Sequence, residues 1–184
     1  KNLSYELEIN DFIDSPFNNG MIIYPRKECH NCFTGTDNII SYSVDWRERN
    51  AVTNVKNQGE CGSCWSFSST GSIEGINAIN FRRLHNVSEQ QLMDCSTEEG
   101  NQGCEGGTMD NAFKYVINNN GLCSEEDYPY QGEQGSCQEN QCNNVVNISD
   151  YSDVEQNNEH MLMRAVSQQP ISVAIQANVS SFKF

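Results

Sequence analysis

The chain has 184 residues, of which 36% are hydrophobic and 20% are charged, and its 25 acidic and 11 basic residues give a net charge of −14 at pH 7. The length predicts one domain or two small ones. The acidic surplus argues against nucleic acid or an anionic membrane surface as a partner, because binding phosphates needs clustered Lys and Arg. No run approaches the ~18 apolar residues of a membrane span.

The cysteine content indicates an oxidising compartment and disulfide bonds. The nine cysteines are Cys29, Cys32, Cys61, Cys64, Cys95, Cys104, Cys123, Cys137 and Cys142. Because their number is odd, at least one thiol is unpaired or pairs outside the chain. Asn-x-Ser tripeptides fit a secretory route, although they also arise by chance in an Asn-rich chain. They begin at Asn2, Asn86, Asn147 and Asn178.

The first 42 residues differ in pattern from the rest and predict a separate module. An alternating run over 5–12 predicts a short strand, and a turn-rich stretch over 14–20 precedes a polar connector to Ser43. The chain starts at Lys1 with neither Met nor an apolar signal segment, and it stops soon after an apolar run. We therefore expect an internal piece of a longer secreted precursor.

The middle of the chain carries the clearest helix signals. Residues 64–81 contain no proline and mix Trp65 and isoleucines with small residues, which predicts a buried central helix that other elements approach closely. Ser88 followed by Gln91 forms a capping box that opens a short helix. Apolar residues at helical spacing predict a third helix from Met109 to about residue 120, where Asn-Gly supplies a stop.

After the first module, strand signals appear only near the end of the chain. Leu162, Ala165 and Val166 predict one more helix, which ends before Pro170, and the apolar run over 171–175 predicts a strand. Helices in the middle with strands after them indicate an α+β fold.

The segment with the strongest chemical signal is 57–65, Asn-Gln-Gly-Glu-Cys-Gly-Ser-Cys-Trp. This glycine-rich loop feeds into the predicted central helix, and Cys64 lies in the first turn, where the helix N-terminus stabilises a thiolate nucleophile. Gly59 and Gly62 allow the backbone to approach a substrate closely. Gln58 can direct an amide N–H toward the oxyanion formed on an attacked carbonyl, a contact worth about 3 kcal/mol.

The Cys-x-x-Cys spacing of Cys61 and Cys64 permits other interpretations. A thioredoxin-like redox pair would follow a strand in a βαβ pattern, and no such strand precedes Cys61. A four-thiolate zinc site with Cys29 and Cys32 would need a gap longer than the usual ~15–20 residues. A purely structural disulfide role for both cysteines also remains open.

Five motifs occur in a fixed order along residues 44–184. They are Val44-Asp-Trp-Arg, the run from Ala51 to Phe67 around Cys-Gly-Ser-Cys-Trp, Ser88-Glu-Gln-Gln-Leu-Met-Asp-Cys95, Gly103-Cys-x-Gly-Gly107 and Tyr128-Pro-Tyr130. Together they resemble the papain-like cysteine proteases of the cathepsin L type, for which Cys-Gly-Ser-Cys-Trp is a known local signature.

The resemblance implies a role for each matching residue. Cys64 would be the nucleophile, and the Gln58 side chain with the Cys64 backbone N–H would form the oxyanion hole. Disulfides would join Cys61 to Cys104 and Cys95 to Cys137, each worth up to ~4 kcal/mol on the chain-entropy model. A Cys123–Cys142 bridge is a further hypothesis, because these two cysteines flank Cys137.

Substrate contacts follow from the same resemblance. Gly106 and Gly107, together with Gly62, would offer backbone groups to an extended peptide. Met109 and Ala174 fall where the family lines its main specificity pocket, which implies an apolar side chain two positions before the scissile bond. Met109 is equally compatible with a plain helix core position.

The first module is similar to the family's inhibitory prosegment. Asn10-x-Phe12-x-Asp14 matches the end of the prosegment motif, although Glu8 stands where the family usually has Gly. The resemblance implies that residues 1–42 run backwards through the active-site cleft until cleavage near 39–43. Cys29-His-Asn-Cys32 departs from the family pattern and predicts a local disulfide, with a metal site as the second option.

A thiol protease also needs a histidine beside the cysteine and an asparagine that orients it. None of the three histidines, His30, His85 and His160, stands in the family's register. The resemblance places the catalytic His and Asn about 25 or more residues past Ala174. We therefore expect an active parent protein and an inactive 184-residue chain.

The combined expectation is a papain-like two-domain α+β fold. It comprises a prosegment over 1–42, a helical domain over 43–152 and the start of a β-rich domain over 153–184. The expected function is a cysteine endopeptidase precursor that acts through a Cys64 thioester. The alternative is a non-catalytic papain-like binding or storage protein. Such a protein would need neither Gln58 nor Cys64. We expect no cofactor and no metal, a monomer, peptide or protein substrates, the prosegment as inhibitor, and a secreted or lysosome- or vacuole-like location.

Overall fold

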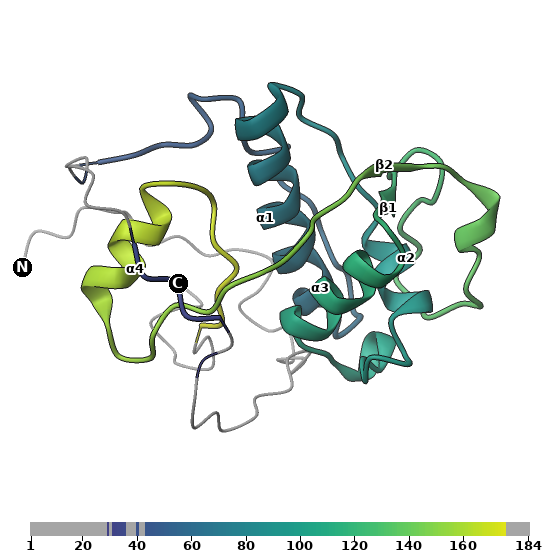
Figure 1. Ribbon diagram of the computed structural model, residues 1–184. Coiled ribbons are helices and arrows are strands. Elements are labelled where there is room, and N and C mark those ends of the chain that lie inside the picture. Colours follow the sequence, from purple (N-terminus) through teal and green to yellow (C-terminus); the bar gives the residue numbers. More distant parts are fainter. Residues whose placement is uncertain (1–28, 30, 36–39, 41–42, 176–184) are drawn as a thin grey trace, which may run out of the picture.

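The computed structural model describes residues 29, 31–35, 40 and 43–175 (Figure 1). The helices are α1 (Cys64–Phe81), α2 (Glu89–Cys95), α3 (Met109–Asn118) and α4 (Glu159–Val166), and the strands are β1 (Leu122–Cys123) and β2 (Asn144–Val146). Short 3-10 turns, η1 and η2, cover Gly103–Glu105 and Glu139–Gln141. The described part is therefore mixed α+β. The strand expected over 5–12 and the turn over 14–20 lie outside the described residues.

Helix α1 is the central element, as its sequence predicts. In Figure 1, α2 and α3 lie on one side of α1 and α4 lies on the other. Trp65 and Ile73 are fully buried against the core, whereas Phe81 at the far end is exposed. Gly75 permits a close approach, because a Cβ there would lie 2.5 Å from Pro170 Cγ. The remaining core residues are mostly aliphatic: Val87, Leu92, Met93, Ala112, Val116, Leu122 and Val146.

The helix boundaries have local causes. The Ser88 Oγ accepts a hydrogen bond from the Gln91 backbone N–H at 2.9 Å, which caps α2. The Thr108 side chain caps α3 in the same way. Past the end of α3, Asn120 and Gly121 both adopt positive φ, a conformation that Gly and Asn tolerate best. The predicted starts of α2 and α3 and the predicted stop of α3 are therefore confirmed.

The sheet is small and pairs distant segments. β1 and β2 are antiparallel with Leu122 opposite Val146, and a separate bridge joins Val87 to Ser124. The bridge between Val87 and Ser124 places the segment that precedes α2 beside the segment that follows α3.

The strand predicted over 171–175 is wrong in the described part of the chain. These residues have no ladder partner there, and a strand exists only through its pairing. Instead, the Ser172 Oγ donates a hydrogen bond to the Ser68 carbonyl at 2.6 Å, so this segment lies along α1. None of the helices described combines the length and hydropathy that a membrane crossing requires.

Candidate active site

The disulfides single out Cys64. They join Cys61 to Cys104, Cys95 to Cys137, Cys123 to Cys142 and Cys29 to Cys32. These are the two pairs that the resemblance implies and the two proposed on other grounds. Cys64 is then the one free thiol among the nine cysteines, all of which lie in the described residues. Because Cys61 is bridged elsewhere, the redox-pair and zinc interpretations of Cys61 and Cys64 do not hold.

Cys64 is the first residue of α1 and is half-buried. Burial raises the pKa of its thiol, and the backbone N–H groups of Trp65 and Cys64 lower it only in part. The helix N-terminus therefore favours the thiolate, as the sequence predicts, but it does not lower the pKa of Cys64 overall. The N-terminal N–H groups act as expected, but desolvation of the thiolate outweighs them.

The loop before α1 is held by Tyr130. The Tyr130 hydroxyl donates to the Gln58 carbonyl at 2.7 Å and lies 2.6 Å from the Ser63 Oγ. Its ring also packs edge-on against Phe67, with centroids 4.9 Å apart. The Gln58 Nε2 donates to the Cys61 carbonyl at 2.9 Å. Because an amide carries two N–H donors, one remains for a further acceptor. Sequence analysis missed the role of Tyr130, although Tyr130 closes one of the five motifs.

The η1 segment lies against the start of α1. The Gly62 backbone N–H donates to the Cys104 carbonyl at 3.0 Å, and the Trp65 Nε1 donates to the Gly103 carbonyl at 3.2 Å. A Cβ at Gly107 would lie 2.6 Å from the Trp65 ring. Gly62, Gly106 and Gly107 are all buried. The structure thus brings the predicted backbone-binding segment next to Cys64, and packing is one reason for its glycines.

Of the two predicted pocket residues, one lines a cavity and the other follows a residue that lines it. Met109 lines a cavity of about 750 Å³ between α1, α3 and the chain around α4. Val173 also lines this cavity, but Ala174 does not and is exposed. Neither Cys64 nor Gln58 borders the cavity.

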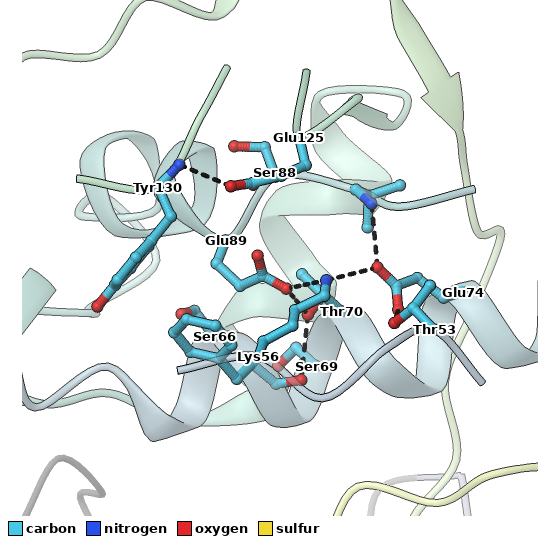
Figure 2. Close-up of polar contacts among 12 residues, drawn as sticks. Thr53, Lys56, Ser66, Ser69, Thr70, Glu74, Ser88, Glu89, Glu125 and Tyr130 are labelled. Carbon is cyan, nitrogen blue, oxygen red and sulfur yellow. Dashed lines mark hydrogen bonds and ion pairs between the residues drawn. The ribbon is translucent and has the colours of Figure 1, made fainter. Parts of the chain in front are cut away.

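Figure 2 shows a buried charge cluster in which Lys56 pairs with Glu74 of α1 and Glu89 of α2. The Lys56 Nζ is 2.8 Å from the Glu74 Oε1 and 2.5 Å from the Glu89 Oε1. Both carboxylate side chains are 1% exposed. Thr53 donates to Glu74, and Thr70 donates to Glu89. The cluster therefore joins the loop that carries Lys56 to both α1 and α2.

Glu125 adds a third acid next to this cluster. Its Oε1 accepts a hydrogen bond from the Tyr130 backbone N–H, while its Oε2 is buried without a partner among the described residues. Burial, with the nearby charge of Glu89, raises the pKa of Glu125 to about 7. Burial also raises the pKa of Glu89 despite its contact with Lys56. Tyr130 thus connects the acidic cluster to the Gln58 loop.

No base reaches Cys64 from the described histidines. His85 lies between Arg83 and Val87, which bond to side chains 13 and 10 residues after Cys64 on α1, about 15–20 Å along the axis at 1.5 Å per residue. His160 is exposed on α4, and His30 lies outside the described residues. Within the described residues, the one group with metal-ligand proximity is Cys95, Cys137 and Glu139. Its two sulfurs are bonded to each other, so they offer no thiolate ligand.

Comparisons with known proteins agree with this architecture. A family model described as papain family cysteine protease matches residues 40–184. A KDEL-tailed cysteine endopeptidase of Arabidopsis thaliana is 41% identical over 200 residues, which cover 100% of this chain and 55% of the relative. The chain spans about half the length of the curated relatives that it matches first.

Solved structures show the same fold. A recombinant stem bromelain precursor has a TM-score of 0.79 at 38% identity, covering 95% of this chain and 55% of that one. Bromelain from Ananas comosus, in complex with the E64 inhibitor, has a TM-score of 0.72 at 43% identity, covering 76% and 63%. The described elements are thus an α+β part of the papain-like fold, and the chain belongs to the papain family of cysteine proteases.

Proposed function

We propose that this chain carries the nucleophile of a cysteine endopeptidase precursor. The observation that carries the proposal is the one free thiol, placed at the start of α1 beside a loop that Tyr130 holds in place. The Cys64 thiolate attacks a peptide carbonyl carbon, and the oxyanion accepts hydrogen bonds from the Gln58 amide and the Cys64 backbone N–H. The amine leaves with a proton, and water hydrolyses the thioester to regenerate the thiol.

The proton transfers require a base, which we assign to a histidine beyond residue 184, oriented by an asparagine. The raised pKa of Cys64 supports this assignment, because an imidazolium beside the sulfur would stabilise the thiolate. The 184-residue chain alone is then inactive.

We assign residues 1–42 to the inhibitory prosegment, 43–152 to a helical domain and 153–184 to the start of a β-rich domain. The stem bromelain precursor covers 95% of this chain, against 76% for bromelain itself, which supports a precursor segment at the start. The paired cysteines support a secretory, lysosome-like or vacuole-like compartment. Met109 and Ala174 remain our proposed contacts for an apolar side chain two residues before the scissile bond.

The test compares the full-length precursor after removal of residues 1–42 with its Cys64→Ser variant. We expect peptide hydrolysis and covalent labelling by E64 in the first and neither in the second. Peptides with an apolar residue two positions before the cut should be cleaved fastest. The 184-residue chain should show no turnover.

Two results would contradict the proposal. Turnover by Cys64→Ser would exclude Cys64 as the nucleophile. A correctly processed, fully oxidised parent without turnover would favour a binding or storage protein instead.

A further inference from the structure

Two of the Asn-x-Ser tripeptides lie within the described residues, and they start at Asn86 and Asn147. The proposed catalytic role uses neither asparagine. Because both belong to the same kind of motif, differences in their surroundings decide which one suits covalent modification.

Asn86 lies in the extended connection between α1 and α2. Its backbone carbonyl accepts a hydrogen bond from Glu125, and the next residue, Val87, is 0% exposed. Neighbouring side chains of an extended chain point to opposite sides, so the burial of Val87 turns Asn86 outward. The Asn86 side chain is exposed, and no hydrogen bond holds its amide within the described part of the chain.

Asn147 is also exposed, but its amide has a partner. Its Nδ2 donates to the Asn120 Oδ1 at 3.5 Å, and its Cβ would lie 3.3 Å from a Cβ at Gly121. Asn147 also borders the 750 Å³ cavity. A sugar on this nitrogen would displace the Asn120 contact and stand at the mouth of the cavity.

We propose that Asn86 carries an N-linked oligosaccharide. The donor is an oligosaccharide joined through pyrophosphate to a polyprenyl lipid. The Asn86 Nδ2 attacks the anomeric carbon of the first sugar, a nitrogen–carbon bond forms and the carbon–oxygen bond to phosphate breaks. The lipid pyrophosphate leaves with the electron pair, and Nδ2 gives one proton to a basic group of the transferase. The paired cysteines are consistent with passage through the compartment where this transfer occurs.

The fold also sets the order of events. The Ser88 hydroxyl, the third position of the motif, is 0% exposed, donates to the Tyr128 carbonyl at 2.6 Å and caps α2. A transferase that must reach this hydroxyl has no access to it in the folded chain. Transfer to Asn86 therefore precedes the docking of α2.

The glycan would lie away from the proposed chemistry. Asn86 precedes Val87, whose N–H donates to Glu74, and Glu74 stands ten residues after Cys64 on α1, about 15 Å along the helix axis at 1.5 Å per residue. Its occupancy should leave the reactivity of the Cys64 thiol unchanged.

The test secretes the full chain from a eukaryotic host and maps the peptides after peptide-N-glycosidase treatment in heavy-oxygen water. We expect Asn86 to be converted to labelled aspartate. Asn86→Gln should lose the mass of one glycan relative to the wild type. Asn54→Gln, at an exposed asparagine outside any such motif, is the matched control and should lose none.

A second arm tests the order of events. Purified transferase and lipid-linked donor are offered the folded, oxidised chain and the reduced, unfolded chain. The unfolded chain should accept sugar at Asn86 at least tenfold faster. An unlabelled Asn86 in the secreted chain, or equal rates in the second arm, would overturn the proposal. The peptide map does not depend on any variant folding.

Discussion

At the scale of single residues, the pKa of the Cys64 thiol decides how reactive the folded chain is at neutral pH. Burial raises its pKa, and the groups that lower it are two backbone N–H donors at the start of α1. Only the thiolate is a nucleophile, so the folded chain should be a weak one at neutral pH.

Alkylation of Cys64 by a neutral reagent tests this directly. Because the other eight cysteines are paired in disulfides, all of the alkylation that is measured comes from Cys64. We expect the rate to keep rising above pH 9 and to lie several-fold below that of the urea-unfolded, still oxidised chain at pH 7. A rate that levels off below pH 7 would reveal a cation beside the sulfur and contradict our assignment of the base.

Glu125 makes a separate prediction about pH. Its pKa of about 7 in the folded chain lies above the ordinary value of 4.5, so the folded state binds more protons between these values. The stability linked to this proton is complete below pH 4.5 and is lost as pH rises through 7. The full shift corresponds to about 3 kcal/mol, which we reduce to about 1 kcal/mol because the side chain is partly exposed.

Glu125→Gln removes this titration and keeps the oxygen that accepts from Tyr130. In urea titrations, the variant should match the wild type near pH 4 and exceed its unfolding free energy by about 1 kcal/mol at pH 8. Equal curves at both pH values would show that Glu125 is ionised without cost. Glu126→Gln, at the exposed neighbouring acid, serves as the control.

At the scale of elements, α1 lets one substitution be tested in two environments. Gly71 and Gly75 are both helical glycines, and Ala is about 1 kcal/mol more favourable than Gly in a helix interior. Gly71 has open space around it, whereas a Cβ at Gly75 would lie 2.5 Å from Pro170 Cγ and 3.1 Å from the Ala51 carbonyl.

We therefore expect Gly71→Ala to stabilise the chain by up to about 1 kcal/mol, and Gly75→Ala to destabilise it by about 1–2 kcal/mol after the propensity gain is subtracted from an overpacking cost of about 2–3 kcal/mol. Thermal unfolding of the two variants measures whether each substitution raises or lowers the stability of the chain. Equal stabilisation by both would mean that the segment around Pro170 does not pack on α1.

Elements defined by nearby residues could be predicted from the sequence, and elements defined by distant partners could not. The start of α2 follows from Ser88 and Gln91, three residues apart, and α1 from a proline-free run. The strand prediction over 171–175 was wrong because a strand depends on a partner segment, which the residues of 171–175 alone do not specify. Likewise, Cys64 and Gln58 stand in one motif, but the contact from Tyr130 to Gln58 spans 72 positions.

At the scale of the whole molecule, the Lys56 cluster connects segments that the disulfides leave apart. Lys56 precedes the nucleophile loop, Glu74 belongs to α1, and Glu89 opens α2. Burial alone would lower the pKa of Lys56, but the charges of Glu89 and Glu74 outweigh it and raise that pKa. The ammonium therefore stays charged and is the cation that balances these buried acids among the described residues.

Removing this cation should weaken the fold as a whole. Lys56→Met leaves two carboxylates at 1% exposure without a counter-charge, a change that typically costs about 3–5 kcal/mol. Urea unfolding should show a loss of that size at pH 8 and a smaller loss at pH 5, because Glu89 and Glu125 have raised pKa values and take up protons more readily there. Lys114→Met, at an exposed position on α3, should change stability by less than about 0.5 kcal/mol.

A double variant distinguishes the charge from the side chain's packing. Adding Glu89→Gln to Lys56→Met removes one of the stranded charges and keeps the acceptor for Thr70. It should therefore recover about 1–2 kcal/mol at pH 8. If the double variant is instead less stable than Lys56→Met by the full effect of Glu89→Gln alone, the two side chains act independently. The cluster would then not be the electrostatic link between the nucleophile loop, α1 and α2.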